Sequence, residues 1–352
     1  MKRVLIDLER LRAPNSGLGQ VALYLGRELA AMQSDDWEPV FLLPSANPEL
    51  VAPGVSFEVP TLMGRHFRRW RGNYDLWHVL HQDARLLPPK ATPYLLTVHD
   101  LNFLGEKSGD KAARRLQKVQ KLVDGAAAIS VISGYTRSVI EQHLALGDTP
   151  VHVIYNGIPT AEPGQQTRPG FLPDGPFLFT VGVVRPKKNF HVLVDMLKHV
   201  AGFNLVIAGN RKGDYAEQLE AQATDKGLAD RVFVCGEVTD EEKNWLFANC
   251  TAFLFPSLYE GFGLPLVEAM SYGKPSFSST RTSLPEVGGN DVVYWDSFDA
   301  EGMAQTFHDG LAAFEADPQR SERLRQRAAG FSWAAAAKDY AALYLSLLRT
   351  TG

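Results

Sequence analysis

Two glutamates that bracket a glycine-bearing turn are the residues of this sequence best suited to chemistry. Glu260 and Glu268 are separated by seven residues, which read GFGLPLV. The apolar run at 251–257 predicts a buried strand before the turn, and Pro265 suits the first turn of a helix after it. Unpaired N–H groups at a helix start favour an anion, and carboxylates accept hydrogen bonds from sugar hydroxyls. The segment therefore suits a ligand with a phosphate and a sugar. The alternative is an ordinary turn with two solvated glutamates.

This segment resembles the Glu-x7-Glu signature of retaining glycosyltransferases with the two-domain GT-B fold, in particular those of family 4. The resemblance covers nearly the full length of the chain. It implies that Glu260 contacts hydroxyls of a donor sugar and that Glu268 contacts the ribose of its nucleotide. Further donor contacts are implied for the turn between the two glutamates, at Gly261, Phe262, Gly263 and Leu264.

A basic turn in the second half of the chain is a further candidate site. Arg185, Lys187 and Lys188 follow a predicted strand that ends at Gly182, and a helix is expected after them. Cations at this point could neutralise a diphosphate. A solvated basic turn without a ligand would have the same sequence pattern. Relatives in the resembled family have a lysine that matches Lys188 and an arginine where Lys187 stands. A point charge therefore replaces a planar fork at that position. The resemblance implies that this segment, Gly182 included, binds the donor diphosphate.

A glycine turn near the start of the chain, Gly17 and Gly19, follows the first predicted strand and opens a helix. Glycine there would allow close approach to a phosphate, and a simple helix start is equally compatible. A dinucleotide fingerprint would also need a third glycine and an acid after the second strand. The second strand is followed by no such acid, which disfavours a dehydrogenase. In the resembled family a glycine-rich loop here faces the donor phosphates.

His99 and Asp100 end a predicted strand at 94–99. From the residues alone, a structural histidine is the ordinary interpretation. The resemblance implies instead that His99 lies near the reacting sugar and that Asp100 orients its imidazole or caps the following turn. A metal is not expected, because His78 and His81 would point to opposite faces of a strand. The predicted co-substrate is a nucleoside diphosphate sugar, and no cofactor or metal is predicted.

A basic and aromatic cluster lies in the first half of the chain. Residues 65–121 hold 12 Lys and Arg against 5 Asp and Glu, on a chain whose net charge is −4. Such a patch could hold an anionic acceptor or lie on an anionic membrane leaflet, and a solvated face is the alternative. The acidic balance of the whole chain gives no support for nucleic-acid binding. The residues expected at the acceptor or membrane are Arg65, Arg68, Arg69, Trp70 and Arg71.

The elements that must position these residues alternate between strand and helix in both halves of the 352-residue chain. This pattern predicts two Rossmann-like domains with parallel sheets facing a cleft, and the resemblance implies a final helix that crosses back to the first domain. A proline-rich stretch at 158–176 predicts a linker. The expected domains are an acceptor domain at 1–165, a donor domain at 166–331 and the returning helix at 332–352. Strands are expected at 2–8, 39–44, 75–81, 94–99, 126–133, 151–156, 176–182, 204–209, 231–236, 251–257 and 275–279. Helices are expected at 18–33, 109–124, 135–146, 188–200, 214–226, 240–249, 264–273, 300–315, 318–329 and 332–349.

Taken together, these features indicate a retaining hexosyltransferase that moves a mannose- or glucose-type sugar to a glycan or glycolipid, in cell-surface polysaccharide or lipopolysaccharide assembly. Retention without a dedicated nucleophile implies front-face attack by the acceptor hydroxyl. A cytoplasmic location is expected, because acids interrupt the first apolar run and exclude a signal peptide. Peripheral contact at the inner face of the membrane is expected from the basic cluster. The alternatives are a non-catalytic sugar-nucleotide-binding protein and a GT-B-fold epimerase. The catalytic residues that the resemblance implies are His99, Asp100, Lys188 and Glu260.

Overall fold

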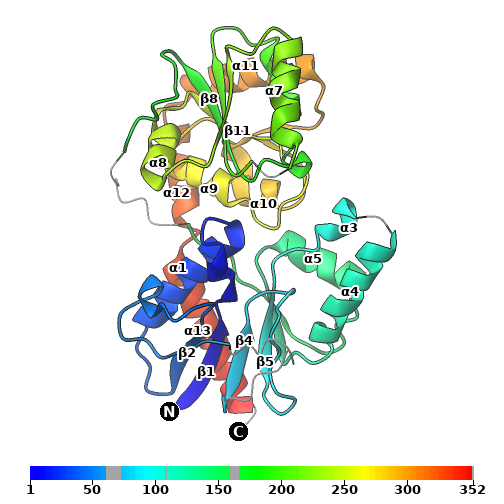
Figure 1. Ribbon diagram of the computed structural model, residues 1–352, viewed down its shortest axis with the longest axis vertical. Helices are drawn as coiled ribbons and strands as arrows, with labels where there is room; N and C mark the ends of the chain where they lie inside the picture. Colours follow the sequence, from blue (N-terminus) through cyan, green and yellow to red (C-terminus); the bar gives the residue numbers. More distant parts are fainter. Residues whose placement is uncertain (61–72, 108, 159–165, 212, 351–352) are drawn as a thin grey trace. The chain divides into compact units, whose positions relative to one another are not determined.

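The computed structural model describes residues 1–60, 73–107, 109–158, 166–211 and 213–350. The chain forms two compact units (Figure 1). Unit 1 comprises Met1–Pro159 together with Ser332–Gly352, and unit 2 comprises Thr160–Phe331. Each unit is built on a parallel sheet whose strands are buried by helices on both faces, as near-continuous apolar strands require.

Unit 1 contains a seven-stranded sheet in the order β3-β2-β1-β4-β5-β6-β7. Its strands pair in parallel register, and the chain order reverses between β1 and β4. Ligands of such sheets bind beyond the carboxyl ends of the strands, at this switch point. The strands are β1 Lys2–Asp7, β2 Trp37–Leu42, β3 Phe57–Glu58, β4 Leu76–Val79, β5 Tyr94–Val98, β6 Ala128–Val131 and β7 Val151–Val153.

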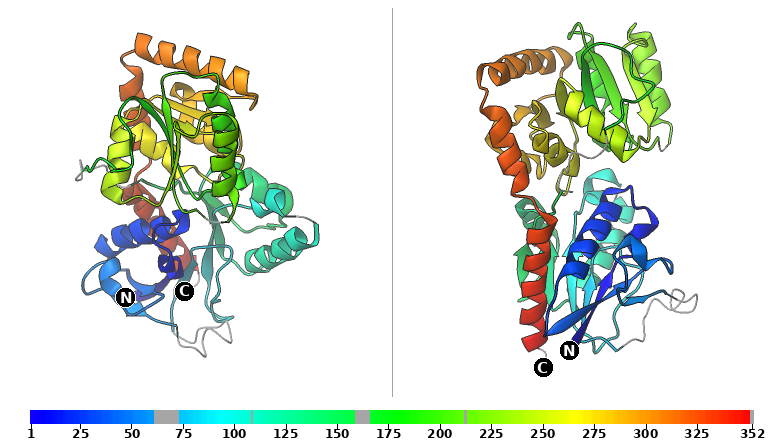
Figure 2. Two further views of the ribbon diagram at one scale, coloured as in Figure 1. Left: turned by 45° about the horizontal axis from the view of Figure 1, so that its top comes forward. Right: turned by 90° about the vertical axis from the view of Figure 1, so that its left-hand side faces the viewer.

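Helices cover both faces of the unit 1 sheet. One face packs against α1 and α13 and the other against α4 and α5. The last helix, α13, runs beside this sheet (Figure 2) and buries Trp333, Tyr340 and Tyr344 against it. The helices are α1 Gly17–Ala31, α3 Phe103–Glu106, α4 Gly109–Val123, α5 Gly134–His143 and α13 Trp333–Thr350.

Unit 2 repeats this architecture with a six-stranded parallel sheet in the order β10-β9-β8-β11-β12-β13. Its switch point lies between β8 and β11. The strands are β8 Phe177–Val181, β9 Asn204–Ala208, β10 Val232–Gly236, β11 Ala252–Phe255, β12 Ser276–Ser279 and β13 Val293–Trp295. The helices are α6 His191–Leu197, α7 Tyr215–Asp225, α8 Asp240–Asn249, α9 Leu264–Ser271, α10 Leu284–Gly288, α11 Ala300–Ala316 and α12 Arg320–Ala329.

The predicted fold class, with two Rossmann-like sheets and a terminal helix returning to the first, is confirmed. The expected strands all form, although most are shorter than predicted, and β4 ends at Val79 rather than at His81. Among the described residues, and apart from 3₁₀ helices, four short strands and α-helices were not predicted. They are β3, β13, α3 and α10, each of two to five residues, which is too short to show a period in the sequence.

Candidate active site

A lysine and a glutamate form an ion pair at the switch point of unit 2. Lys188 ends a short 3₁₀ helix, Pro186–Lys188, after β8, and Glu260 follows β11. The Lys188 Nζ lies 2.6 Å from Glu260 Oε1, and the two side chains are 11% and 14% exposed. The ammonium also lies 4.9 Å from the centre of the Phe255 ring, a cation–π contact. The two predicted catalytic residues of unit 2 are therefore in direct contact, and only a small fraction of each side chain is exposed to solvent.

One backbone hydrogen bond ties together the two loops that carry this pair, and a second bond ties the Glu260 loop to the loop after β12. The Leu258 N–H donates to the Lys187 carbonyl at 2.9 Å, and the Glu260 N–H donates to Thr282 Oγ1 at 3.1 Å. The half-buried Arg185 precedes the 3₁₀ helix, and its carbonyl accepts from the Lys188 N–H at 2.9 Å. The three predicted cations of this segment thus lie on one short turn, and Lys188 among them contacts Glu260.

Gly182 leaves room for the lysine. Its φ is +154°, and a Cβ at this position would lie 3.1 Å from Lys188 Cε. The neighbouring Gly209 approaches it closely, because a Cβ there would lie 2.0 Å from the Gly182 carbonyl oxygen. A side chain at either position would push against the site, so both glycines are needed for packing alone.

The turn between the two glutamates begins helix α9 as predicted. Gly263 adopts the left-handed conformation at the helix N-cap, with φ +100°, and Pro265 lies in the first turn. The Phe262 side chain is buried and packs edge-on against Phe331, with ring centres 5.3 Å apart. Gly261 is also buried, and Leu264 is half-buried. The contribution of this turn to a ligand would therefore come from backbone N–H groups rather than from the phenyl ring.

Glu268 forms a second ion pair, which the sequence analysis did not predict. Lys243 of α8 lies 3.1 Å from Glu268 Oε1 and 3.4 Å from Asp240. The charge of Glu268 is the main cause that raises the pKa of Lys243 above its usual value. Lys243 and Glu268 lie 25 residues apart on different helices, so no local pattern in the sequence could have paired them.

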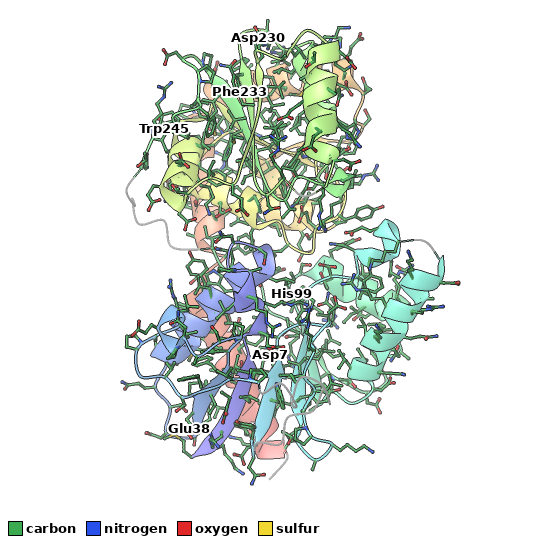
Figure 3. The ribbon with its side chains drawn as sticks, viewed as in Figure 1. Asp7, Glu38, His99, Asp230, Phe233 and Trp245 are labelled. Atoms are coloured by element: carbon green, nitrogen blue, oxygen red, sulfur yellow. The ribbon has the colours of Figure 1, made fainter. Side chains whose placement is uncertain are left out.

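Buried polar side chains lie at the switch point of unit 1, where β1 and β4 end. Asp7 ends β1 and is buried, and burial raises its pKa to about 7. Its Oδ1 accepts a hydrogen bond from the Glu9 N–H at 2.9 Å. Figure 3 marks Asp7 and His99 in this part of unit 1. A carboxyl group that titrates near neutral pH is a functional candidate, and the sequence analysis did not single it out as one.

His99 lies just beyond β5, as predicted, and is buried. Its Nε2–H donates to the Leu80 carbonyl at 2.8 Å, so its Nδ1 carries the lone pair. Burial lowers its pKa to about 4, which keeps the imidazole neutral at pH 7. Gln82 holds the segment, since its Oε1 accepts from the His99 N–H and its Nε2 donates to the Asp100 carbonyl. The Asp100 carboxylate caps the following turn by accepting from the Asn102 N–H at 3.0 Å.

A second histidine stacks on His99. The rings of His81 and His99 are 5.5 Å apart and inclined by 26°. The His81 Nδ1 accepts hydrogen bonds from Arg10 Nη2 and from the Asp83 N–H, both at 2.8 Å. Burial is the main cause that lowers the pKa of His81 well below its usual value, and the nearby His99 and Arg10 add to it. Unit 1 therefore presents uncharged imidazoles at the ends of β4 and β5.

The first glycine turn is explained largely by packing. Gly19 donates its N–H to Ser16 Oγ at 3.1 Å, which is the N-cap of α1. A Cβ on Gly19 would lie 2.0 Å from the Ala13 carbonyl oxygen, whereas Gly17 is exposed with no atom nearby. Only Gly17 of the two leaves space around its Cα, and a role of either glycine toward phosphate stays a prediction.

His78 and His81 have separate partners. His78 is fully buried in β4, where its ring nitrogens contact Tyr344 Oη at 2.6 Å and Thr97 Oγ1 at 2.7 Å. Burial lowers its pKa to about 3. Within the described part of the chain, no group of three or more His, Cys, Asp and Glu side chains is arranged to hold a metal ion.

The predicted basic and aromatic cluster, Arg65, Arg68, Arg69, Trp70 and Arg71, lies outside the described residues. The neighbouring basic segment forms α4, whose buried face includes Val119 and Leu122. Cations at spacings of three and four residues share one exposed face of this helix. They are Lys111, Arg114, Lys118 and Lys121. We call these four residues the α4 basic face.

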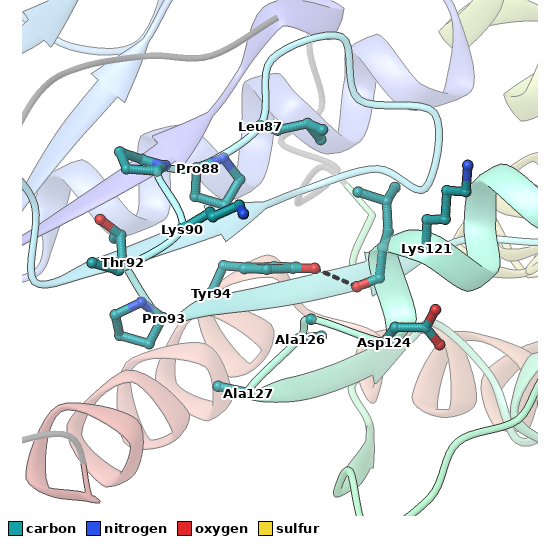
Figure 4. A pocket seen from close by; sticks show the side chains of 14 residues that line it. Leu87, Pro88, Lys90, Thr92, Pro93, Tyr94, Lys121, Asp124, Ala126 and Ala127 are labelled. Atoms are coloured by element: carbon teal, nitrogen blue, oxygen red, sulfur yellow. Dashed lines mark hydrogen bonds between the residues drawn. The ribbon is translucent and has the colours of Figure 1, made fainter.

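A cavity of about 670 Å³ lies at the amino-terminal end of the unit 1 strands, near the start of β5 and the end of α4 (Figure 4). Its walls include Pro88, Lys90 and Tyr94, and the Tyr94 hydroxyl donates to the Leu122 carbonyl. Lys121 of the α4 basic face also lines it. Because the histidines lie beyond the carboxyl ends of the strands, this cavity is separate from the candidate site of unit 1.

Among the described residues, no helix is both long enough and apolar enough to span a membrane.

Two family models match the chain. The model described as glycosyl transferases group 1 matches residues 165–331, and the model described as glycosyltransferase family 4 matches residues 15–162. Each model coincides with most of one structural unit. Together they cover most of both sheets, whereas β1 and α13 lie outside the matched residues.

Curated relatives include two from Escherichia coli. The O-antigen chain mannosyltransferase B is 26% identical over 285 residues, which span 73% of this chain and 71% of the relative. The serotype-specific mannosyltransferase WbdA is 29% identical over 169 residues, which span 46% of this chain but only 21% of WbdA.

A solved structure of HepE from Anabaena in complex with UDP-glucose has the same fold. It superposes with a TM-score of 0.76 at 16% identity, over 98% of this chain and the whole of that one. The family models, the relatives and the fold agree with the resemblance that the Glu-x7-Glu segment indicated. This chain belongs to the group 1 and family 4 glycosyltransferases.

Proposed function

We propose that this protein is a hexosyltransferase that moves a mannose- or glucose-type sugar from a nucleoside diphosphate sugar to a hydroxyl of a glycan or glycolipid. The proposed setting is the assembly of cell-surface polysaccharide or lipopolysaccharide. The two relatives reported above are mannosyltransferases, one of them of the O-antigen chain, and the HepE structure contains UDP-glucose. These names support a nucleotide sugar as donor.

The observation that carries the proposal is the pair of Lys188 and Glu260 at the switch point of unit 2. A nearly buried ammonium acts strongly on a leaving diphosphate, because little water screens its charge. The partner carboxylate lies beside it and can accept hydrogen bonds from sugar hydroxyls. One contact thus brings together a group for the phosphate and a group for the sugar.

We propose that the diphosphate is held without a metal ion. Arg185, Lys187 and Lys188 follow β8 on one turn, and the first N–H groups of α9 follow β11. Both kinds of group attract anions at a helix or loop terminus. These groups supply positive charge for a diphosphate from the protein itself, so a divalent cation is not required for neutralisation. No cofactor enters this account.

We propose that the anomeric configuration is retained by front-face attack. The acceptor hydroxyl would transfer its proton to the leaving diphosphate oxygen, while its oxygen forms the bond to the anomeric carbon and the bond to the diphosphate breaks. The ammonium of Lys188 lies 2.6 Å from the Glu260 carboxylate and lowers its nucleophilicity. This arrangement suits Glu260 for binding the sugar better than for attacking it.

His99 is proposed to bind a sugar hydroxyl as a neutral group. Its Nε2–H is used by the Leu80 carbonyl, so the remaining nitrogen is an acceptor. A hydroxyl is a suitable donor to it, whereas an imidazolium could not accept a hydrogen bond there. Asp100 would support His99 indirectly, by capping the turn that follows it. Gly17 and Gly19 are assigned to the donor phosphates by resemblance alone.

We propose that the α4 basic face, with the arginines at 65, 68, 69 and 71 and Trp70, lies against the anionic leaflet in which a glycolipid acceptor is embedded. Clustered basic residues are attracted to such a surface. The protein would then act in the cytoplasm, at the inner face of the membrane. Cys235 and Cys250 are free thiols, a state that a reducing compartment maintains.

The proposal is tested by incubating the protein with GDP-mannose, UDP-glucose and UDP-galactose and following release of the nucleoside diphosphate. One of these donors should be hydrolysed slowly without an acceptor, and faster with a polyprenyl-linked glycan. Glu260→Gln should abolish the release. The anomeric coupling constant of the product, measured by NMR, reports retention. If no donor bound or reacted, a hexosyltransferase function would be refuted.

A further inference from the structure

The lysine of α8 that pairs with Glu268 is in an unusual charge environment for a phosphate-binding residue. Lys243 lies 3.1 Å from Glu268 and 3.4 Å from Asp240. Two carboxylates to one ammonium leave a net negative charge around it. An anionic phosphate is disfavoured there, whereas a neutral group that donates hydrogen bonds is favoured. The turn that carries Arg185, Lys187 and Lys188 has the opposite balance.

The pair is held in place on both sides. Asp240 and Lys243 lie three residues apart on α8, so they share one face of the helix. Lys243 and Glu268 are 21% and 18% exposed, so the carboxylate is partly shielded without being closed off from solvent. Tyr272, one turn after Glu268, stacks its ring on Phe247 of α8 with centres 5.7 Å apart. These contacts fix the distance between the two helices that carry the pair.

A carboxylate that is held in one orientation can bind two adjacent hydroxyls. An ionised carboxylate accepts through both oxygens, and each oxygen has a second lone pair. The ammonium on Oε1 therefore leaves acceptor capacity for a pair of hydroxyls. It also holds the carboxylate in place and so lowers the ordering cost that a free glutamate side chain would have on binding.

We propose that Lys243 is a positioning residue that holds the Glu268 carboxylate for the 2′- and 3′-hydroxyls of a ribose, and so makes the site select ribonucleoside over deoxyribonucleoside diphosphates. This inference rests on the proposed function, because it takes Glu268 to face the ribose of the donor. It adds a residue from a second helix and a selectivity to that function.

The test is calorimetric titration of the full chain with GDP and UDP and with their 2′,3′-dideoxy analogues. Lys243→Met keeps the length of the side chain and removes its charge. It should weaken binding of the preferred ribonucleotide about tenfold, as loss of support for a charge-assisted hydrogen bond would. Binding of the dideoxy analogue should change by less than about twofold, because no hydroxyl is present to sense the carboxylate.

The matched control is Lys226→Met, which breaks another ion pair of unit 2, to Asp195 at 2.8 Å. It should leave both titrations unchanged. Glu268→Gln should abolish the preference for ribose, and adding Lys243→Met to it should have no further effect. Thermal unfolding of each variant confirms that the fold is intact.

Two results would overturn the inference while leaving the proposed function standing. One is equal ribonucleotide binding by wild type and Lys243→Met. The other is equal weakening of ribo and dideoxy ligands, which would place Lys243 at the phosphate or the base. Failure of wild type to bind either diphosphate would refute the proposed function itself and the inference with it.

Discussion

The switch point of unit 2 holds paired charges, whereas that of unit 1 holds neutral imidazoles. In unit 2, Lys188 and Glu260 follow β8 and β11 and lie 2.6 Å apart. In unit 1, His81 and His99 follow β4 and β5, and burial keeps both uncharged at pH 7. The sheets have the same arrangement around the switch point, so the scaffold does not decide the chemistry. The residues placed after each strand make one edge suited to a diphosphate and the other to hydroxyls.

Among the substitutions that would remove this difference, replacement of Lys188 should have the largest effect, and that effect should be on turnover. Lys188→Ala should lower kcat by about 10²–10³, since negative charge on the leaving diphosphate grows in the transition state. Donor binding should weaken much less. Steady-state kinetics and thermal unfolding of the variant check this, with the exposed Lys198→Ala as control. A rise in KM with unchanged kcat would make Lys188 a binding residue only.

The buried histidines of unit 1 predict a larger loss of stability in acid than is expected of unit 2, where partial burial also lowers the pKa of His191. The folded-state pKa values of His78 and His99 are about 3 and 4, below the ordinary 6.5. The unfolded chain therefore takes up these protons first. Each histidine contributes stability in full above about pH 6.5 and loses it as the pH falls, by about 1.4 kcal/mol per pH unit.

Hydrogen exchange at pH 7 and pH 5 measures this loss in the two sheets separately. Protection of amides in β4 and β5 should fall more than that in β8 and β11. Asp7 acts with the opposite sign, because its pKa is raised to about 7 and its folded form holds a proton that the unfolded form has lost. Asp7→Asn should therefore steepen the acid loss. Equal loss in both sheets would contradict the assignment of buried neutral imidazoles to unit 1.

A smaller effect is expected from the α4 basic face. Each cation near an anionic membrane is worth about 1 kcal/mol at low salt. Replacing Lys111, Arg114, Lys118 and Lys121 with Gln should release the protein from phosphatidylglycerol vesicles in a sedimentation assay, while donor hydrolysis stays unchanged. Replacing exposed cations of unit 2, Lys198 and Arg325 for example, is the control. Undiminished sedimentation of the variant would leave the face as a solvated surface.

No change is expected on chelation. Because cations and the first N–H groups of α9 neutralise the diphosphate in this account, transfer should survive EDTA. Assays with and without EDTA, followed by addition of Mn²⁺ or Mg²⁺, check this. Loss of transfer that either ion restores would show that the charge of the diphosphate is shared with a metal.

Much of the fold could be predicted because its signals are local. Strands buried on both faces appear as continuous apolar runs, and α8 was predicted with its observed bounds, since Thr239 and Glu242 form a capping box at its start. The resemblance implies that Lys188 and Glu260 both serve the donor, but it does not predict their direct contact. These residues are 72 positions apart, and nothing near either residue in the sequence identifies its partner.

The state of the unit 1 site could not be predicted, because it depends on atoms from distant segments. The tautomer of His99 is set by the Leu80 carbonyl, and the acceptor role of His81 Nδ1 is set in part by Arg10. The pKa of Asp7 is raised mainly by its complete burial. The position of an aspartate at the end of a strand does not predict that burial. The sequence of the turn at Gly19 fits a phosphate site and a simple helix start equally well, and the close approach of Ala13 accounts for this glycine without a ligand.

The most direct test of the difference between the two switch points is hydrogen exchange with and without a saturating nucleoside diphosphate, GDP or UDP, and no sugar. The account predicts that protection appears chiefly at residues 182–190 and 258–268 of unit 2. Amides at residues 78–83 and 97–100 of unit 1 should change little, since their partners are hydroxyls that this ligand lacks. Protection confined to the unit 1 segments would contradict the account.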